Sequence, residues 1–365
     1  MKQALEQRLS ELFGYSDGVL FGRARSGISA LLEILGTGEK FDFVIPSNIC
    51  PVLYTVGLDC GASVRLCPVD PNSGLPVDRD MATCVSDGAD AGLVMPANLY
   101  GFVQNYSETA RAARARGWFV LENDTMATKA RLSSNAQRSA YGDALLVSFG
   151  EGKSIDAGGG GVILSDDERL CGQLRSLRAK YRPLDQLARS RENWILAFRL
   201  QLRAGFPGGP SMAHLNEHLI EVEALNLRYD FPDDLIAPLD RAINGLADTV
   251  SMRRDCAAVW DDKLDQFGDR LKKPPLEQPA PWRVIRTIPK LRDVVADQLR
   301  ANGVDAGINY SPLDQYFPVG LAGQHHPDAD TWGNEVLNLW VDKSYNPDRI
   351  SDAADTIGSV FQQFL

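Results

Sequence analysis

A single lysine stands between a serine and a run of glycines in the stretch SFGEGKSIDAGGGGVILS, residues 148–165. Ser148 lies five places before Lys153, and glycines 158–161 begin five places after it. A lysine that forms a Schiff base needs a partly desolvated amine, because an unperturbed pKa of about 10.4 leaves almost none of it neutral at pH 7. The glycines would leave room for a bulky covalent partner. Taken alone, the segment is explained equally well by a surface loop lysine beside a flexible turn.

Composition describes an ordinary globular chain of 365 residues, with 44% hydrophobic and 24% charged residues. The net charge of −10 and the absence of a basic tract argue against nucleic acid or an anionic membrane surface as a partner. The N-terminal segment MKQALEQRLSELFGYS has the pattern of an amphipathic helix rather than of a signal peptide. Six cysteines without a CxxC pair favour a reducing cytoplasm.

Histidine and cysteine spacing predicts no metal site. His214 and His218 have the i, i+4 spacing of two ligands on one helix face, but no third candidate ligand lies near them in the sequence. An exposed helical face is the simpler interpretation.

The first half of the chain alternates helical and apolar segments. The pattern predicts helices over 26–35, with Ser26 as the cap and an end at Gly36, and over 51–61 and 106–117. It predicts strands over 41–47, 63–70, 118–124, 144–150 and 160–165, and a strand with a loop over 91–101. Such a pattern is typical of an α/β fold whose mostly parallel sheet is sandwiched by helices. Ligands bind beyond the carboxyl ends of such strands, where the polar residues are Ser47, Asn48, Asn98, Asn123, Asp124 and Ser148.

The second half divides into an irregular region and a smaller unit. We expect a large domain over 1–245, with an insertion at about 182–230, and a small C-terminal α+β domain over 246–365. A long helix is predicted over 235–264, followed by the linker KKPPLEQPAPW.

Several motifs resemble those of the DegT/DnrJ/StrS sugar aminotransferases. They are RSGISALLEIL, FVIPSN, GLDCGASVRLCPVDPNSG, ANLYG, FVLEND, YGDALLVSFGEGKSIDAGGGGVILSDDERL and LRANGVDAGINYSPL, in that order. The resemblance is strongest from about 20 to 180 and weakens between about 182 and 250. It implies fold type I, pyridoxal 5′-phosphate bound to Lys153 and a homodimer. It also implies transfer of an amino group from glutamate or glutamine to a keto sugar, linked to a nucleotide, or to a related keto substrate.

The resemblance also implies which residues hold the cofactor's phosphate. They are Gly27, Ile28 and Ser29 at the start of the first helix, together with Ser148. Ile28 stands where the family usually has threonine, so only its backbone amide could bind. Ser148 could equally be a core hydroxyl.

A carboxylate must keep the cofactor's pyridine nitrogen protonated. Counting from upstream, Asn123 takes the place of the family aspartate; counting back from Gly142 and Asp143, Asp124 does. We choose Asp124 because an asparagine cannot protonate the ring, and an assignment to Asn123 would argue against transamination.

Other positions depart from the family pattern. Ala127 replaces a glutamine or histidine, Cys50 stands where an aromatic ring commonly stacks on the cofactor, and Asn98 replaces a common histidine. The asparagine that a neighbouring subunit gives to the phosphate is poorly matched; Asn226 could play that part, but Tyr229 also aligns.

These departures leave two other functions open. One is a pyridoxal phosphate-dependent lyase, dehydratase or condensing enzyme that acts on an amino acid with the same fold. The other is a binding or regulatory protein without catalysis, which the presence of Lys153, Ser148 and Asp124 disfavours.

Overall fold

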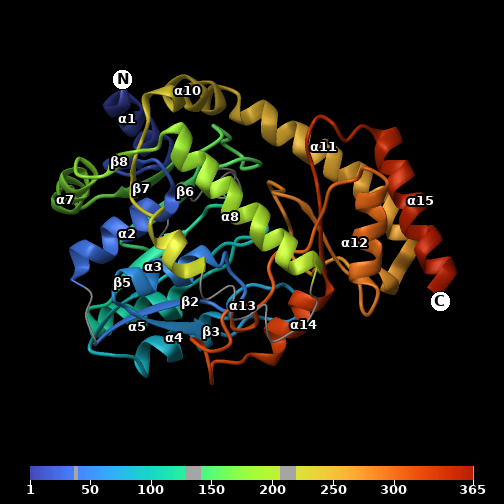
Figure 1. Ribbon diagram of the computed structural model, residues 1–365, viewed down its shortest axis with the longest axis horizontal. Coiled ribbons are helices and arrows are strands. Elements are labelled where there is room, and N and C mark those ends of the chain that lie inside the picture. Colours follow the sequence, from blue (N-terminus) through green and yellow to red (C-terminus); the bar gives the residue numbers. More distant parts are fainter. Residues whose placement is uncertain (37–39, 128–140, 206–218, 365) are drawn as a thin grey trace.

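A nine-stranded sheet forms the centre of the larger part of the molecule (Figure 1). The computed structural model describes residues 1–365 except 37–39, 128–140, 206–218 and 365. The strand order is β3-β2-β4-β5-β6-β7-β1-β9-β8. The strands are β1 (Asp17–Phe21), β2 (Phe41–Pro46), β3 (Ser63–Cys67), β4 (Ala91–Val94), β5 (Phe119–Asn123), β6 (Ala144–Ser148), β7 (Gly161–Ser165), β8 (Arg182–Pro183) and β9 (Tyr229–Asp230).

The sheet is mostly parallel, as the sequence predicts. Strands β3, β2, β4, β5 and β6 pair in parallel, whereas β7 runs antiparallel to both β6 and β1. Strand β1 therefore points in the same direction as β6. Strand β1 was not predicted, because it lies before Ser26, where the predicted alternation of helices and strands begins.

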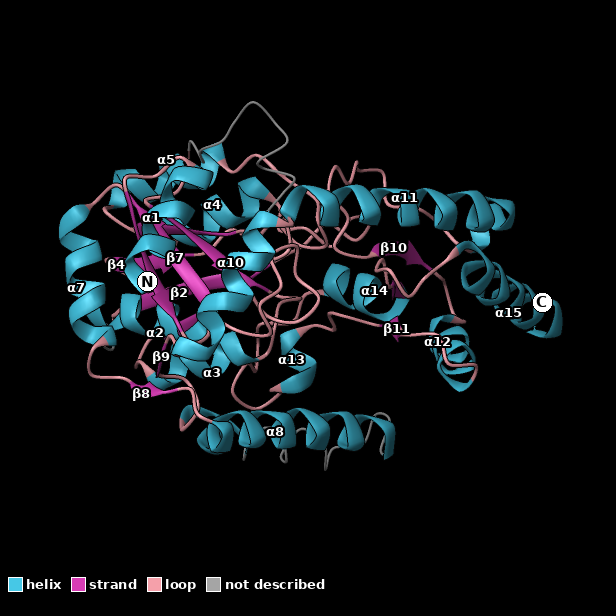
Figure 2. Cartoon of the chain, turned by 90° about the horizontal axis from the view of Figure 1, so that it is seen from above, coloured by secondary structure: helices cyan, strands magenta, loops and turns pink. Residues whose placement is uncertain are grey.

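Helices cover the sheet, as the near-continuous burial of its strands requires (Figure 2). In the larger part they are α1 (Lys2–Phe13), α2 (Ala24–Leu35), α3 (Val52–Asp59), α4 (Asp78–Ser86), α5 (Ser107–Arg116), α7 (Glu168–Arg178), α8 (Gln186–Gly205) and α10 (Ile236–Asn244). No helix in the described part of the chain is both long and apolar enough to cross a membrane.

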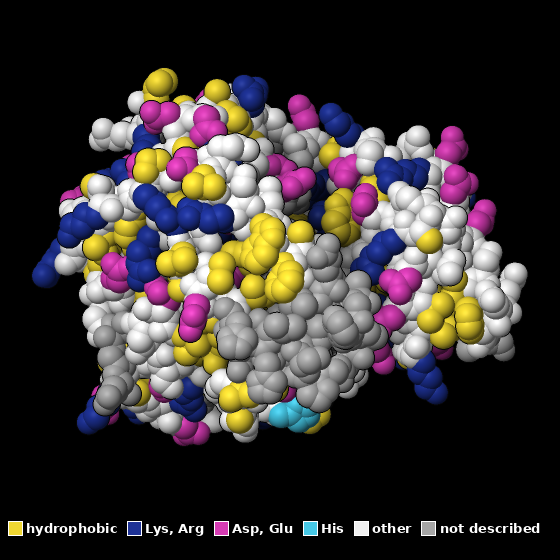
Figure 3. Space-filling model, in the orientation of Figure 1, with side chains coloured by type: hydrophobic (Ala, Val, Ile, Leu, Met, Phe, Trp, Pro, Cys, Tyr) yellow, Lys and Arg dark blue, Asp and Glu magenta, His cyan; other side chains and the backbone are white. Residues whose placement is uncertain are grey.

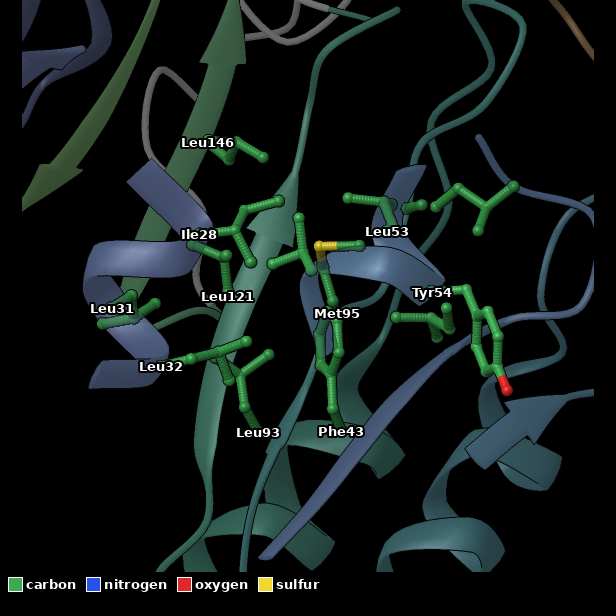
Figure 4. Packing of buried hydrophobic residues seen from close by; sticks show 14 of the residues in the cluster. Ile28, Leu31, Leu32, Phe43, Leu53, Tyr54, Leu93, Met95, Leu121 and Leu146 are labelled. Carbon is green, nitrogen blue, oxygen red and sulfur yellow. The ribbon is translucent and has the colours of Figure 1, made fainter. Parts of the chain in front are cut away.

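The main core lies between α2, α3 and the sheet (Figure 4). Ile28 and Leu32 project from α2 towards Leu93, Leu121 and other apolar side chains of the strands, and all of them are fully buried or nearly so. Burial of a side chain of this size contributes about 1.5–3 kcal/mol. Packing of this face thus fixes α2, and with it the start of the helix, against the sheet.

Two helix predictions were wrong at particular residues. Helix α2 begins at Ala24 with Arg23 as N-cap, so Ser26 is not the cap. Instead the Ser26 hydroxyl donates to Leu227 O at 2.5 Å and accepts from Tyr229 N at 3.2 Å, which ties the helix to a distant segment. The single helix expected over 235–264 is broken at Gly245 into α10 and α11 (Leu246–Leu264).

A smaller unit follows α11 and contains a separate three-stranded sheet of order β10-β12-β11. Its elements are β10 (Val284–Thr287), α12 (Arg292–Ala301), β11 (Ala306–Gly307), α13 (Leu313–Tyr316), α14 (Pro327–Glu335), β12 (Val336–Leu339) and α15 (Pro347–Phe364). Helix α11 runs from the larger part into this unit (Figure 2). Leu313 and Trp332 of this unit, however, pack into the hydrophobic core beside the large sheet, so the two parts are joined by a common core.

The region expected as an insertion joins the main sheet at its edge. Strands β8 and β9 pair in parallel, and β9 contacts β1 through Phe21 and Asp230. Helix α8 comes between β8 and β9 in the sequence. It lies along the outside of the molecule (Figure 2). His214 and His218 lie outside the described residues.

Candidate active site

One edge of the large sheet gathers the polar residues that follow its strands. The carboxyl ends of β2, β4, β5, β6 and β1 lie there, together with the amino end of β7. Gly161 is the register partner of both Ser148 and Phe21, so the loop that carries Lys153 leaves and rejoins the sheet beside the start of α2. The fold therefore brings Ser148, Lys153, the glycine run and the α2 N-terminus to one place.

Lys153 is half-buried in this loop. Burial lowers the pKa of its amine from 10.5 to about 8; the charges of Arg283 and Arg253 act in the same direction, and Cys50 acts against them. The Nζ atom lies 5.3 Å from the centroid of the Trp282 ring. No carboxylate in the described part of the chain forms an ion pair with it. The amine is consequently available as a free base in a much larger fraction than that of an ordinary lysine.

One carboxylate closes the Lys153 turn. Asp156 accepts from Gly152 N at 2.7 Å and from Gly158 N at 2.8 Å. Both glycines have positive φ, 76° and 75°, which other residues rarely adopt. From outside the turn, Arg253 of α11 donates to the carbonyls of Gly152 at 2.8 Å and Lys153 at 3.0 Å. The backbone around the lysine is therefore held from two sides.

Asp124 follows β5 and is completely buried. Burial raises the pKa of its carboxyl from 3.8 to about 7, although Asn98 Nδ2 donates to Asp124 Oδ1 at 2.7 Å and acts against the rise. The neighbouring Asn123 has a different environment: its Oδ1 accepts from Thr125 N at 3.1 Å and its Nδ2 faces the sulfur of Met95. Asn123 and Asp124 were the two candidates for the residue that faces the pyridine nitrogen. Of these, only Asp124 has a carboxyl group, and its burial without a cation suits it to pair with one.

Gly159, Gly160 and Gly161 pack closely against protein, whereas a Cβ atom on Gly158 would meet open space. A Cβ atom on Gly161 would lie 2.6 Å from Ala24 Cα, and one on Gly160 would lie 2.8 Å from the Phe231 ring. Gly160 also has a φ of 97°. Gly160 and Gly161 thus allow the start of α2 and the Phe231 ring to approach the Lys153 loop, a role that the sequence did not predict.

The predicted phosphate residues divide into two groups. Gly27, Ile28 and Ser29 lie inside α2, beyond the amides of residues 24 and 25 at the start of its first turn, which a helix leaves without partners. The next amide, Ser26 N, donates to Arg23 O at 3.0 Å. Ser148 ends β6; its hydroxyl accepts from Gly150 N at 3.4 Å and donates to no described residue.

One carboxylate of α8 pairs with two arginines at the start of α2. Glu192 pairs with Arg23 at 2.6 Å and with Arg25. Both arginines flank the first turn of α2, where the helix dipole already favours an anion. The inserted helix is therefore anchored at the predicted phosphate end of the site.

Two further predicted residues have contrasting surroundings. Cys50 is half-buried after β2 and lies close enough to affect the pKa of Lys153. Asn226 is buried, and its amide donates to Val222 O at 3.0 Å and accepts from Tyr229 OH at 2.7 Å. The Asn226 side chain is thus engaged within its own chain, as is the hydroxyl of Tyr229, the other candidate.

Three residues near Lys153 were not found from the sequence: Arg253, Trp282 and Arg283. The Arg283 guanidinium carbon lies 4.7 Å from the Trp282 ring centroid and 3.7 Å from that of Trp340. Both arginines are buried. They stand about a hundred residues or more from Lys153 in sequence, and no local pattern marks them.

A surface groove of about 580 Å³ lies at the opposite edge of the sheet. It is lined by the first residues of β2, β4 and β5, namely Phe41, Ala91 and Phe119, and by Asp143. None of the predicted site residues lines it, so its size does not make it the candidate site.

The chain is similar in sequence to two known enzymes and in fold to a solved structure. It is 24% identical to the dTDP-4-dehydro-2,3,6-trideoxy-D-glucose 4-aminotransferase of Saccharopolyspora spinosa, over 90% of this chain and 81% of that protein. It is 22% identical to the GDP-perosamine synthase of Caulobacter vibrioides, over 92% and 83%. A Streptococcus pneumoniae protein solved in a PLP form has the same fold, with a TM-score of 0.76, 14% identity, and coverage of 100% of this chain and 92% of that one.

The family comparison extends over more than half of the sequence. Residues 1–203 match the model of the DegT/DnrJ/EryC1/StrS aminotransferase family, and this range includes Lys153, Asp124, Ser148 and the start of α2. The matching range also contains the strands whose carboxyl ends form the site. With the fold and the position of the lysine in agreement, the chain belongs to the DegT/DnrJ/EryC1/StrS aminotransferase family.

Proposed function

We propose that this protein is a pyridoxal phosphate-dependent aminotransferase that moves an amino group from glutamate or glutamine to the keto group of a nucleotide-linked sugar. The observation that carries the proposal is Lys153, a half-buried amine whose pKa is lowered by burial to about 8 and which lies beside the strand ends of the large sheet. Two of the chain's relatives are a dTDP-4-dehydro-2,3,6-trideoxy-D-glucose 4-aminotransferase and a GDP-perosamine synthase.

The residues present fit the cofactor. Lys153 would bind its aldehyde, Asp124 would face its ring nitrogen, and Ser148 with the first turn of α2 would bind its phosphate. Once bound, pyridoxal phosphate supplies an electron sink that stabilises negative charge on the carbon bearing the amino group. Half-buried Cys50 would lie near the ring, at the position where the resemblance to the family implies an aromatic residue.

Each residue's contribution follows from its environment. While it is not joined to the cofactor, Lys153 Nζ would be free to take a proton from the donor's α carbon and to return it elsewhere. Its lowered pKa keeps the amine close to equal parts base and acid near pH 8. Asp124, whose raised pKa of about 7 leaves it partly protonated at neutral pH in the absence of a cation, would become fully ionised when a cation faces it, since opposite charges favour ionisation.

We also propose that the active form is a homodimer. Leu187 and Trp194 of α8 and Leu225 are between 56% and 65% exposed, and hydrophobic side chains gather over this helix (Figure 3). An exposed apolar surface of this kind is typical of a protein interface. Sedimentation of the active protein tests this; a fully active monomer would contradict it.

The function is tested by loading the purified protein with pyridoxal phosphate and adding glutamate or glutamine. Conversion of the bound cofactor's absorbance to that of its amine form supports transamination. Persistence of the original absorbance with every amino donor refutes it. An amino acid that keeps its amino group but loses another substituent would favour a lyase or dehydratase.

The position of the cofactor is tested separately. Borohydride reduction followed by peptide mapping is expected to label Lys153 and to leave Lys180 unlabelled. Lys180 is an exposed lysine just after α7 and serves as the control. The Lys180→Ala variant should keep the cofactor, and Lys153→Ala should lose it. Dependence of product formation on a panel of dTDP- and GDP-linked keto sugars would then identify the acceptor.

A further inference from the structure

Two buried cations stand beside Lys153 without an anion. Arg253 and Arg283 are 5% and 6% exposed. No carboxylate within the described ranges forms an ion pair with either. Burial lowers the pKa of Arg283 to about 10, and the charge of Arg253 contributes in the same direction. Burying two like charges side by side is unfavourable unless something of opposite charge joins them.

The nearest acidic residues do not supply that charge. Asp156 and Asp342 act on the arginines only at longer range. Asp156 is engaged with Gly152 N and Gly158 N, and Asp342 accepts from Ser344 N at 2.8 Å. Both carboxylates therefore shape turns of the chain.

Several donors of the pair are also unused. Arg253 Nε and one of its terminal nitrogens, Arg283 Nε and Trp282 Nε1 are buried and have no acceptor in the part of the chain that the structure describes. Native proteins rarely leave so many buried donors without partners at one place. Guanidinium groups present paired donors that match a carboxylate.

The pair is close to the amine on which the chemistry depends. Arg283 and Lys153 contact the same indole, that of Trp282, at 4.7 Å and 5.3 Å from its centroid. Arg253 donates to the carbonyl of Lys153 itself. An anion bound by the arginines would therefore lie beside the Lys153 segment and the Trp282 ring that the amine faces.

From this arrangement we propose that Arg253 and Arg283 form a subsite for a carboxylate of the amino donor. The inference rests on the proposed function, because it assumes that an amino group exchanges at Lys153. An amino acid carries a carboxylate on the carbon that bears its amino group, whereas the phosphates of a nucleotide sugar are several bonds away from the keto carbon. The enclosure of Arg283 between Trp282 and Trp340 also suits a small planar anion.

The test measures binding without chemistry. Glutarate, a dicarboxylate without an amino group, is titrated by calorimetry into the pyridoxal phosphate-loaded wild type, Arg283→Gln and Arg270→Gln. Arg270 is an exposed arginine of the same small unit and is the matched control. Loss of a charge-assisted hydrogen bond predicts binding about 10- to 100-fold weaker in Arg283→Gln. Arg270→Gln and the cofactor content of both variants should be unchanged.

Kinetics of the two half-reactions complete the test. The KM of Arg283→Gln for glutamate should rise by a similar factor, while its KM for the keto acceptor stays that of the wild type. Should the glutamine variant fail to fold, Arg283→Lys, which keeps the charge but not the paired donors, should show a smaller loss in the same direction.

Unaltered glutarate affinity in Arg283→Gln would overturn the subsite, as would a change confined to the acceptor or one caused by loss of cofactor. Arginine-dependent glutarate binding in a protein that no donor converts would instead refute the proposed function and leave the subsite standing.

Discussion

The lowered pKa of Lys153 can be measured directly. Removal of the Trp282 indole, which lies beside the amine, tests whether burial causes the shift. The change from 10.5 to about 8 corresponds to about 3 kcal/mol in favour of the neutral amine. At pH 7 roughly one molecule in ten then carries a free base, against roughly one in three thousand for an unperturbed lysine. In Trp282→Ala, water reaches the amine and its pKa should rise. Loss of the cation–π contact acts the other way, but it is worth only about 0.5–2 kcal/mol.

Competitive labelling of the cofactor-free protein with trace acetic anhydride, followed by peptide mapping, gives the titration of each lysine. Labelling of Lys153 should reach half its maximum near pH 8, with the exposed Lys180 as internal reference. Trp282→Ala should move the Lys153 midpoint upward, and Trp194→Ala, which removes an exposed indole on α8, should leave it in place. A wild-type midpoint at or above about 10 would refute the account of the amine as desolvated.

Three further predictions concern the surroundings of the lysine. Because the pKa of Asp124 is raised by burial from 3.8 to about 7, its stabilising effect is present below pH 3.8 and is lost as the pH rises through about 7, a difference of about 4 kcal/mol. Cofactor-free Asp124→Asn, uncharged at every pH, should melt above the wild type at pH 8 and close to it near pH 4; a lower melting temperature at pH 8 would contradict this. Gly161→Ala should destabilise the protein by about 1–3 kcal/mol in denaturant titration, because its Cβ would overlap Ala24 Cα. Gly172→Ala in α7, where nothing lies within 4 Å, should be neutral or stabilising, and equal effects of the two would show that the close approach at Gly161 is unimportant. Asp156→Asn loses one of the two acceptors that close the Lys153 turn and should bind pyridoxal phosphate a few-fold more weakly by fluorescence titration, unlike Asp269→Asn at an exposed site.

Local signals explain why some elements could be predicted from the sequence. Helix α2 ends where expected because Gly36 adopts a left-handed φ of 75°, which glycine favours. The position of Lys153 at a strand end follows from the apolar run of β6 just before it. Asp124 follows from β5 in the same way.

Other features depend on contacts that no local pattern contains. The Ser26 hydroxyl forms hydrogen bonds with the backbone of Leu227 and Tyr229. Because these partners are distant in sequence, the local pattern predicted a helix cap instead. Arg253 and Arg283 reach Lys153 only because α11 and the segment before β10 return to the sheet edge. The positions of the two arginines in the sequence do not predict that they lie near Lys153.

Because Ser148 and Gly161 face each other in the β6–β7 register, residues 149–160 form a closed excursion that starts and finishes at one rung of the ladder. The register at that rung does not by itself set their number, but Phe149, Ile155 and Ala157 within them belong to a buried core. The segment that carries the reactive amine is thus also part of the folded core, and a replacement taken from a relative would have to supply equivalent apolar side chains to keep the amine in place.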